Sequence, residues 1–190
     1  QKATQRKNRG RMIRVALVGY TNAGKSTLLN LLSDAGTLAE NKLFATLDPL
    51  TRKAVLDGKE VLVTDTVGFV QKLPHDLVDA FRSTLEEAVH ADLLVHVVDV
   101  SGSEGRDPVE DFHAICEELH NYSIDLGDRP MIVAANKTDI MDPESDNLER
   151  LREAVAEAGC ELYEISAGTT QGTRNLMRVV AEKLRTLPPV

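Results

Sequence analysis

A glycine-rich segment between two apolar runs constrains this chain more than any other feature. Residues 19–27 read GYTNAGKST; they follow the apolar run Ile13 to Val18 and precede the leucine-rich run 28–32. A strand, a glycine loop and a helix in this order, with the pattern G-x-x-x-x-G-K-[ST], are typical of a phosphate-binding loop, or P-loop. Backbone N–H groups and the positive end of the following helix surround a di- or triphosphate in such a loop. We therefore expect a nucleotide phosphate site here.

Two side chains of the P-loop are expected to carry its specific chemistry. Lys25 would reach between the β- and γ-phosphates, and the Ser26 hydroxyl would ligate Mg²⁺. A tight strand-to-helix turn with a solvated lysine is the simpler alternative. The other loop residues are expected to contact the nucleotide: Gly19, Tyr20, Thr21, Asn22, Ala23, Gly24 and Thr27.

Length and composition indicate one intracellular domain. The chain has 190 residues, of which 42% are hydrophobic, which is enough for one full core. No apolar run approaches the roughly 20 residues that span a bilayer, so we expect a cytoplasmic protein without a membrane partner. Cys116 and Cys160 lack metal-site spacing and are expected to be buried, reduced thiols. His90, His96 and the two histidines of 113–120 also lack ligand spacing, which favours core or surface roles.

The charge is distributed unevenly. The net charge is −8, yet residues 1–14 contain six basic residues and no acidic residue. The acidic remainder excludes a general affinity for free DNA, whereas the basic start is either a phosphate-contacting arm or a solvated linker. We expect an arm or linker over 1–11, one monomeric domain over 12–187, and the start of a C-terminal linker over 188–190. The chain would then be a domain of a longer protein.

Apolar runs that alternate with amphipathic segments predict an α/β fold of three layers. Asp57-Gly58 joins two β-rich runs and is a strong hairpin signal, which places one antiparallel strand in a mostly parallel six-stranded sheet. Ligands of such folds lie beyond the carboxyl ends of the strands. The expected strands are 13–18, 52–56, 60–64, 93–98, 131–135 and 162–165. One expected helix follows the P-loop and ends at about residue 33, and a second carries Leu77, Phe81, Leu85 and Ala88 on one face. The other three expected helices span 108–121, 143–158 and 175–184.

The motif D-x-x-G follows the third expected strand as Asp65, Thr66, Val67 and Gly68. An aspartate at this strand end is suited to hold Mg²⁺ through a water, and the glycine N–H to meet a γ-phosphate. The alternative is a simple turn or helix-capping aspartate. Because a strand precedes the motif and a P-loop lies upstream, we favour the nucleotide interpretation.

The motif N-K-x-D follows the fifth expected strand as Asn136, Lys137, Thr138 and Asp139, and it indicates the base. Guanine presents N1–H and N2–H₂ as adjacent donors that one carboxylate accepts together, whereas adenine would leave that carboxylate facing a lone pair. Asn136 is expected to bridge base and loop, and the Lys137 stem to pack along the base. A surface turn is the alternative. After the last strand, Ser166, Ala167 and Gly168 are expected to offer backbone N–H groups to guanine O6.

In their order these motifs resemble those of the translation-factor-related GTPases, and the strings GYTNAGKS, FATLDP (44–49), DTVGF (65–69) and LPHDL (73–77) are similar to the Ras-like G domain of HflX-type ribosome-associated GTPases. The resemblance implies GTP and GDP as ligands, the ribosome as partner, with the large subunit favoured, and flanking domains in the full-length proteins. It further implies that Thr46 is a switch threonine that closes on Mg²⁺ and γ-phosphate. The loop around Thr46 would contact the nucleotide through Phe44, Ala45, Leu47 and Asp48, and residues 66–75 would form a second switch.

Phe69 occupies the position where Ras-like GTPases place the glutamine that orients the attacking water. We therefore expect slow hydrolysis that depends on Lys25, Mg²⁺ and backbone N–H groups, with stimulation by the ribosome. Two further residues are candidates to assist hydrolysis. His75 would approach the attacking water, or it is a helix-capping or surface residue. Asn22 would coordinate K⁺ between the phosphates, or it stabilises the turn of the P-loop. Two other functions also stay open, a module that senses GTP without hydrolysing it and a P-loop ATPase or small-molecule kinase.

Overall fold

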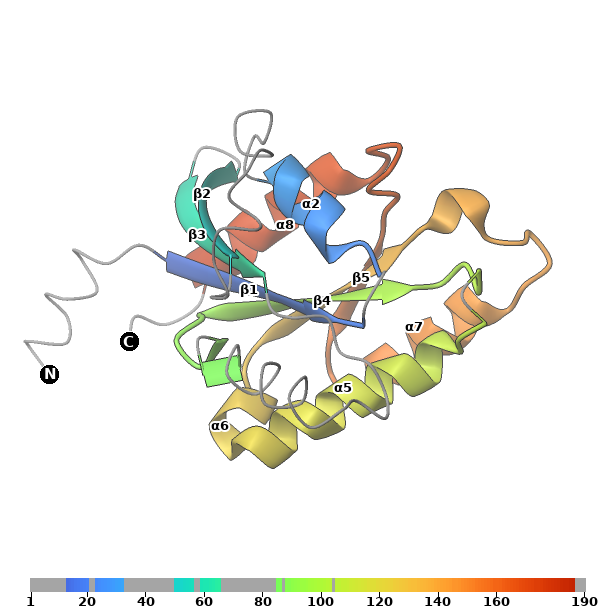
Figure 1. Cartoon of the computed structure of the whole chain (residues 1–190), viewed down its shortest axis with the longest axis horizontal. Coiled ribbons are helices and arrows are strands. Elements are labelled where there is room, and N and C mark those ends of the chain that lie inside the picture. The colour runs from blue at the N-terminus through green and yellow to red at the C-terminus, as the bar shows by residue number, and fades with distance from the viewer. Residues whose placement is uncertain are drawn as a thin grey trace, which may run out of the picture.

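The computed structural model describes residues 13–20, 23–32, 50–56, 59–65, 85–86, 88–103 and 105–186 (Figure 1). A six-stranded sheet with the strand order β2-β3-β1-β4-β5-β6 forms its centre. The strands are β1 (Ile13–Gly19), β2 (Leu50–Leu56), β3 (Lys59–Asp65), β4 (Leu93–Asp99), β5 (Met131–Asn136) and β6 (Glu161–Glu164). The helices are α2 (Lys25–Leu32), α5 (Pro108–Tyr122), α6 (Ile124–Gly127), α7 (Asn147–Glu157) and α8 (Thr173–Thr186), with a short 3₁₀ helix, η2 (Thr138–Ile140).

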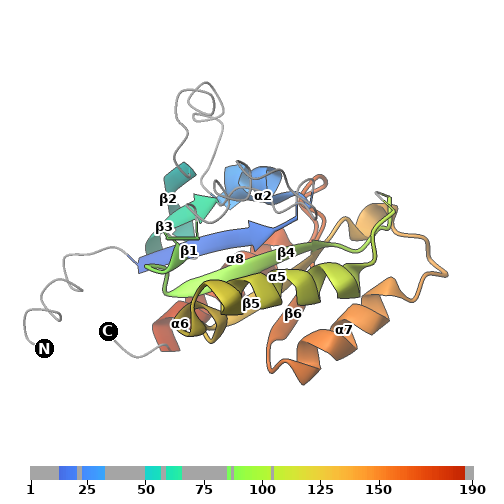
Figure 2. The same ribbon diagram turned by 60° about the horizontal axis from the view of Figure 1, so that its bottom comes forward.

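The sheet confirms the predicted topology. Strand β2 pairs antiparallel with β3, and every other neighbouring pair of strands in the sheet is parallel. Helices α2 and α8 cover one face, and α5, α6 and α7 cover the other, as both views of the ribbon show (Figure 2). The fold is therefore the expected three-layer α/β architecture.

Alternation along the buried strands explains why both faces are covered. Val15 and Leu17 of β1 pack in the cluster under α2 and α8, whereas Ala16 and Val18 point to the opposite face, toward α5 and α6. A strand that is apolar on both sides loses contact with water only when helices pack on both sides. Each large side chain buried in this way stabilises the fold by about 1.5–3 kcal/mol.

One predicted helix starts later than its composition suggests. The segment 143–158 was expected to be helical throughout, but α7 begins only at Asn147. The Asp142 carboxylate accepts a hydrogen bond from the Glu144 N–H (3.0 Å), and the Ser145 hydroxyl accepts one from the Asn147 N–H (3.1 Å). These local bonds satisfy the backbone in a turn and compete with the first helical turn. The short elements α6 and η2 were not predicted, because three- or four-residue helices carry no periodic signal.

The helix at 85–88 and the two cysteines can be compared with their predictions. Leu85, Glu86 and Ala88 are helical as expected, while Leu77 and Phe81 of the same predicted helix lie outside the described residues. Cys116 and Cys160 are free thiols, but both are only partly buried, so their predicted place inside the core was wrong. Their position at the margin of the cluster between β5 and α7 explains this.

Among the described residues, no helix is both long and apolar enough to cross a bilayer.

Strand register brings the ends of the central strands to one edge. Gly19 of β1 pairs with Val97 of β4, and Asp99 at the end of β4 pairs with Asn136 at the end of β5. Asp65 at the end of β3 pairs with Leu17. Residues that are far apart in the chain therefore meet beyond this edge.

Candidate nucleotide site

The P-loop lysine lies in a buried ion pair. Lys25 is the first residue of α2, and its Nζ lies 3.9 Å from Asp65 Oδ1, with side-chain exposures of 7% and 10%. Burial lowers the pKa of Lys25, and the nearby Asp65 carboxylate opposes this effect. Because a buried ammonium is poorly solvated, a polyanion beyond the strand ends would interact with it strongly. This ion pair joins the P-loop to the strand end that carries the D-x-x-G motif.

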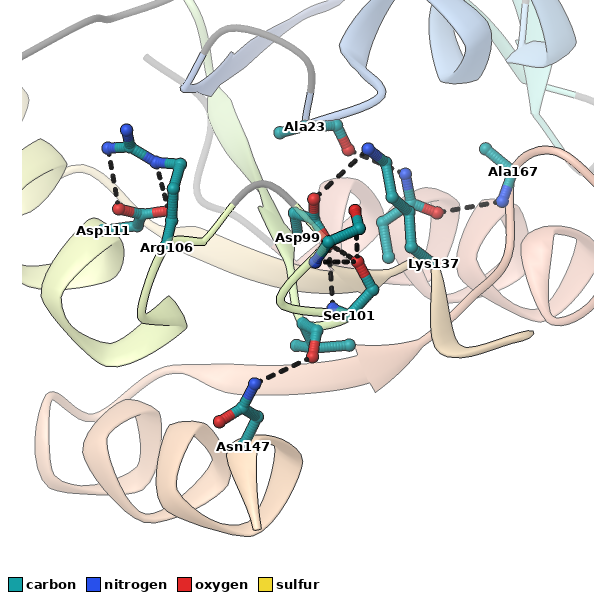
Figure 3. A network of polar contacts seen from close by, with 11 residues as sticks. Ala23, Asp99, Ser101, Arg106, Asp111, Lys137, Asn147 and Ala167 are labelled. Atoms are coloured by element: carbon teal, nitrogen blue, oxygen red, sulfur yellow. Dashed lines mark hydrogen bonds and ion pairs between the residues drawn. The ribbon is translucent and has the colours of Figure 1, made fainter. Parts of the chain in front are cut away.

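Asn136 connects the P-loop to the loop after β6. Its Nδ2 donates to the Ala23 carbonyl at 2.8 Å, and its Oδ1 accepts from the Ala167 N–H at 2.9 Å (Figure 3). The side chain is buried, with 2% of its surface exposed, so both hydrogen bonds are protected from water. This bridge is the predicted role of Asn136 toward the loop.

Gly24 makes this bridge sterically possible. A Cβ atom at this position would lie 2.1 Å from Asn136 Nδ2, and the backbone φ is +106°, a conformation that side chains disfavour. The second glycine of the P-loop is thus required by the contact with β5 as well as by the turn.

Asp139 is held by the loop after β6. The Ser166 hydroxyl donates to Asp139 Oδ1 at 2.8 Å, and it accepts from the Thr169 hydroxyl at 2.8 Å. Thr138 contributes a second link, because its hydroxyl donates to the Ile165 carbonyl at 3.0 Å. Ser166 is fully buried while Asp139 is exposed, so a buried donor orients a carboxylate that faces solvent. The N-K-x-D motif and the Ser166–Ala167 motif therefore form one unit.

Lys137 makes an ion pair that was not predicted. Its Nζ lies 3.2 Å from Oδ2 of Asp99, a buried residue at the end of β4. The other oxygen of that carboxylate accepts from the N–H and the hydroxyl of Ser101, at 2.8 and 2.6 Å. Figure 3 shows Asp99 between Ser101 and Lys137. One signal could have identified it: an aspartate ends an apolar strand here, just as Asp65 does.

A second unpredicted contact reaches the P-loop. The Arg106 guanidinium lies over the Tyr20 ring, with Cζ 3.7 Å from the ring centroid. Asp111 of α5 holds the guanidinium through two hydrogen bonds of 2.9 and 3.1 Å. No short sequence pattern predicts this contact, because Arg106 and Tyr20 are far apart in the chain.

The structure thus brings together most described members of the predicted site. Ser26 and Thr27 lie exposed in the first turn of α2, and Gly168 is exposed in the loop after β6. Among the residues that the structure describes, no three His, Cys, Asp or Glu side chains cluster as a metal site. The remaining predicted residues lie outside the described ranges: Thr21, Asn22, Phe44, Ala45, Thr46, Leu47, Asp48, Thr66, Val67, Gly68, Phe69 and His75.

The four histidines that the structure describes lie in the core or at the surface. His96 of β4 is buried, with its ring centroid 5.4 Å from that of Phe112. His90, His113 and His120 are exposed. Burial lowers the pKa of His96 to about 3, so the ring is neutral at ordinary pH.

Curated relatives named GTPase HflX are similar to this chain. The one from Flavobacterium psychrophilum is 50% identical over 139 residues, which cover 73% of this chain and 32% of the relative. The one from Chlamydia pneumoniae is 46% identical over 187 residues, which cover 96% of this chain and 37% of the relative. A GTPase Obg from Alkaliphilus oremlandii is 41% identical over 93% of this chain and 41% of its own length. The chain therefore spans about a third of the length of the HflX relatives it matches.

Solved structures and a family model agree with this fold. A GTP-binding protein from Sulfolobus solfataricus, solved in complex with GDP, aligns with a TM-score of 0.74 at 26% identity, covering 93% of this chain and 53% of its own. The FeoB G-domain from Methanococcus jannaschii shares the fold, with a TM-score of 0.60 over 91% of this chain and 97% of its own. The family model described as 50S ribosome-binding GTPase matches residues 14–137. The chain therefore belongs to the 50S ribosome-binding GTPase family, and it is a G domain of the HflX type.

Proposed function

We propose that this domain binds GTP and GDP with Mg²⁺ and hydrolyses GTP slowly. The observation that carries the proposal is the Asn136 side chain, which bonds to the P-loop at Ala23 and to the loop after β6 at Ala167. This bridge fixes a phosphate-binding element and a base-binding element at one strand edge. A nucleotide that spans both elements accounts for a buried polar bridge of this kind better than a structural role alone.

Guanine is the base that the donors and acceptors favour. The Asp139 carboxylate is oriented by the Ser166 hydroxyl, and a carboxylate accepts from guanine N1–H and N2–H₂. Together with the N–H groups of 166–168 near O6, it would pair with the polar groups of the guanine edge. Adenine would leave the carboxylate unpaired, which discriminates by roughly 10⁴.

The phosphate end is assigned to the P-loop residues, with Lys25 between the β- and γ-phosphates. The Ser26 hydroxyl and the Asp65 carboxylate are hard oxygen donors of the type that Mg²⁺ takes, so the donor set fits this ion. Bound Mg²⁺ would neutralise charge on the phosphate oxygens. For the loops outside the described residues, we propose that Thr46 and Gly68 contact the γ-phosphate end, and that Asn22 and His75 are candidates to assist hydrolysis.

The partner is proposed to be the ribosome, and within it the large subunit. The description of the matching family model supports this, and the HflX relatives are more than twice as long as the chain. We propose a monomeric, cytoplasmic G domain over 12–187, between a basic arm (1–11) and a linker (188–190), whose full ribosome binding requires flanking domains. GTP and GDP would switch the loop around Thr46 and the segment 66–75 between two states.

Base specificity provides the sharpest test. GDP should bind far more tightly than ADP in a competition titration. In Asp139→Asn, an amide donor replaces an acceptor, so GDP should weaken by at least 100-fold and xanthosine diphosphate, with a 2-oxo group, should gain affinity. Asp142→Asn is the matched surface control. Equal affinities of the wild type for GDP and ADP would overturn the assignment of the base.

Hydrolysis is tested by single-turnover assays with and without large ribosomal subunits, in K⁺ and in Na⁺. We expect an unassisted rate at or below about 10⁻³ s⁻¹, the scale of a small GTPase without its activator. An unassisted rate above roughly 0.1 s⁻¹ would contradict the missing-glutamine argument. Equal rates in K⁺ and Na⁺ would dispose of a K⁺ role for Asn22, and absence of phosphate release even with ribosomes would favour a GTP-sensing module.

A further inference from the structure

We infer that Asp99 is a positioning residue for guanine recognition: it fixes the Lys137 ammonium and thereby places the Lys137 stem against the base. The inference rests on the proposed guanine site and deepens it. Asp99 belongs to none of the sequence motifs that define that site. Its role follows from contacts between the end of β4 and the turn after β5.

The Asp99 carboxylate is oriented on both sides. Oδ1 accepts from the Ser101 N–H at 2.8 Å and from the Ser101 hydroxyl at 2.6 Å, while Oδ2 lies 3.2 Å from Lys137 Nζ. The carboxylate is 8% exposed, so these contacts are largely shielded from solvent. A carboxylate held in this way has one direction in which to attract a cation.

The backbone around Lys137 is fixed as well. Lys137 has φ +71° and ψ 32°, a left-handed conformation that is uncommon for residues other than glycine. The Val100 N–H donates to the Asn136 carbonyl at 3.1 Å, which ties the start of the β4–α5 connection to the residue before Lys137. Both ends of the Lys137 side chain, its Cα and its ammonium, are therefore held by neighbouring structure.

A lysine side chain held at both ends has a defined path for its four methylene groups. Lys137 lies two residues before Asp139, whose carboxylate is the proposed partner of the guanine edge. A restrained stem covers a flat base with less loss of side-chain entropy than a free one. Asp99 would thus strengthen binding of every guanine nucleotide by the same factor, whatever its number of phosphates.

The test measures the dissociation constants of GMP, GDP and a non-hydrolysable GTP analogue for the wild type and Asp99→Asn. We expect a loss of about tenfold that is equal for the three nucleotides, since all three share the base. Asp107→Asn is the matched control: it also removes a carboxylate charge from an ion pair on the β4–α5 connection, with Arg150 at 2.6 Å, and should change binding less than twofold.

A double-mutant cycle with Lys137→Met separates positioning from a general effect on the fold. Methionine keeps an unbranched stem without the ammonium, so in this background Asp99→Asn should cost less than twofold. If Asp99→Asn does not fold, Ser101→Ala replaces it in the cycle, with an expected two- to threefold loss that also disappears with Lys137→Met.

Three outcomes overturn the inference: wild-type affinity in Asp99→Asn, losses that grow with the number of phosphates, and additive losses in the cycle. Wild-type protein that binds no guanine nucleotide would instead refute the proposed function, so the two failures are distinguishable.

Discussion

Two parts of the site, one on each side of Asn136, are stabilised by different physical interactions. On the base side, the N-K-x-D turn and the loop after β6 are joined by directional hydrogen bonds of 2.8–3.0 Å, such as those of Asp139 with Ser166 and of Thr138 with Ile165. On the phosphate side, Lys25 and Asp65 are 3.9 Å apart, and Arg106 stacks on Tyr20. Hydrogen bonds fix direction, whereas the 3.9 Å ion pair of Lys25 with Asp65 is a less directional charge interaction.

We propose that the two sides have different tasks in nucleotide binding. Directional hydrogen bonds hold an acceptor such as the Asp139 carboxylate in one position, and base recognition needs this because a misplaced acceptor would lower the specificity for guanine. A buried ammonium whose pKa is lowered by burial suits the capture of charge, because a bound polyanion would offset its poor solvation. We therefore expect selectivity to depend on the base side and phosphate-dependent affinity to depend on the phosphate side.

Gly24→Ala should give the largest effect, because it breaks the contact between the sides. The new Cβ would lie 2.1 Å from Asn136 Nδ2, and that amide is buried and held by hydrogen bonds to Ala23 and Ala167, so any shift would disturb them. We expect GDP affinity to fall by more than 100-fold, or about 3 kcal/mol, through the loss of two buried hydrogen bonds. Calorimetry measures this loss. Gly105→Ala is the control, since its added Cβ meets nothing within 4 Å and tests the effect of a positive φ alone. Equal losses in the two variants would contradict the steric argument.

His96 tests whether stability is separate from both sides. Its pKa of about 3 in the fold lies below the ordinary 6.5, so the unfolded chain binds the proton more readily as pH falls. The stability contributed by the neutral ring is complete above about pH 6.5 and is lost progressively below it, by about 2 kcal/mol at pH 5. Urea unfolding of His96→Leu between pH 7 and 5 should show a shallower decline than the wild type. The exposed His113→Gln should retain the wild-type decline, and a wild-type slope in His96→Leu would refute the assignment.

Arg106→Ala tests the phosphate side alone. Loss of the guanidinium from the Tyr20 ring should weaken GDP binding by about 1 kcal/mol, or roughly fivefold, while the preference for GDP over ADP persists. Tyr20→Phe keeps the ring and loses only the hydroxyl that hydrogen-bonds to Arg106, so it should lose less affinity than Arg106→Ala, whereas Tyr20→Leu should behave like Arg106→Ala. Changed base preference in Arg106→Ala, measured by competition titration, would show that the two sides are not independent.

Arg152→Ala should give the smallest effect and sets the baseline. Its ion pair with Glu164 lies at the surface, about half exposed on each partner. Exposed pairs contribute about 0.2–1 kcal/mol, and no site residue depends on this one, so thermal stability should change slightly and GDP affinity not at all. A loss of nucleotide affinity would indicate that β6 transmits changes to Ser166.

The sequence predicted the sheet, and the position of the motifs at the strand ends, because both depend on local patterns. The apolar runs of β1, β4 and β5, and the motifs at their ends, are readable in short windows. Asp99 and Arg106 were missed because their partners, Lys137 and Tyr20, are brought near by strand register and not by spacing in the chain. The start of α7 was missed for a different reason, since Asp142 and Ser145 favour a turn over the helix that the composition of this segment suggests.

Because the strands are held in a fixed parallel register, the effect of an insertion depends on where in the domain it is placed. One residue inserted within β4 would displace Asp99 by about 3.3 Å and turn every following side chain to the other face. The opposite edge imposes no such penalty: Asp128, in the turn before β5, and Gly159, before β6, are exposed and precede the strands whose carboxyl ends carry the motifs. Loops grafted at this edge, including reporter peptides or whole domains, should therefore leave nucleotide recognition intact, and lineages of this fold have room to acquire new attachments there.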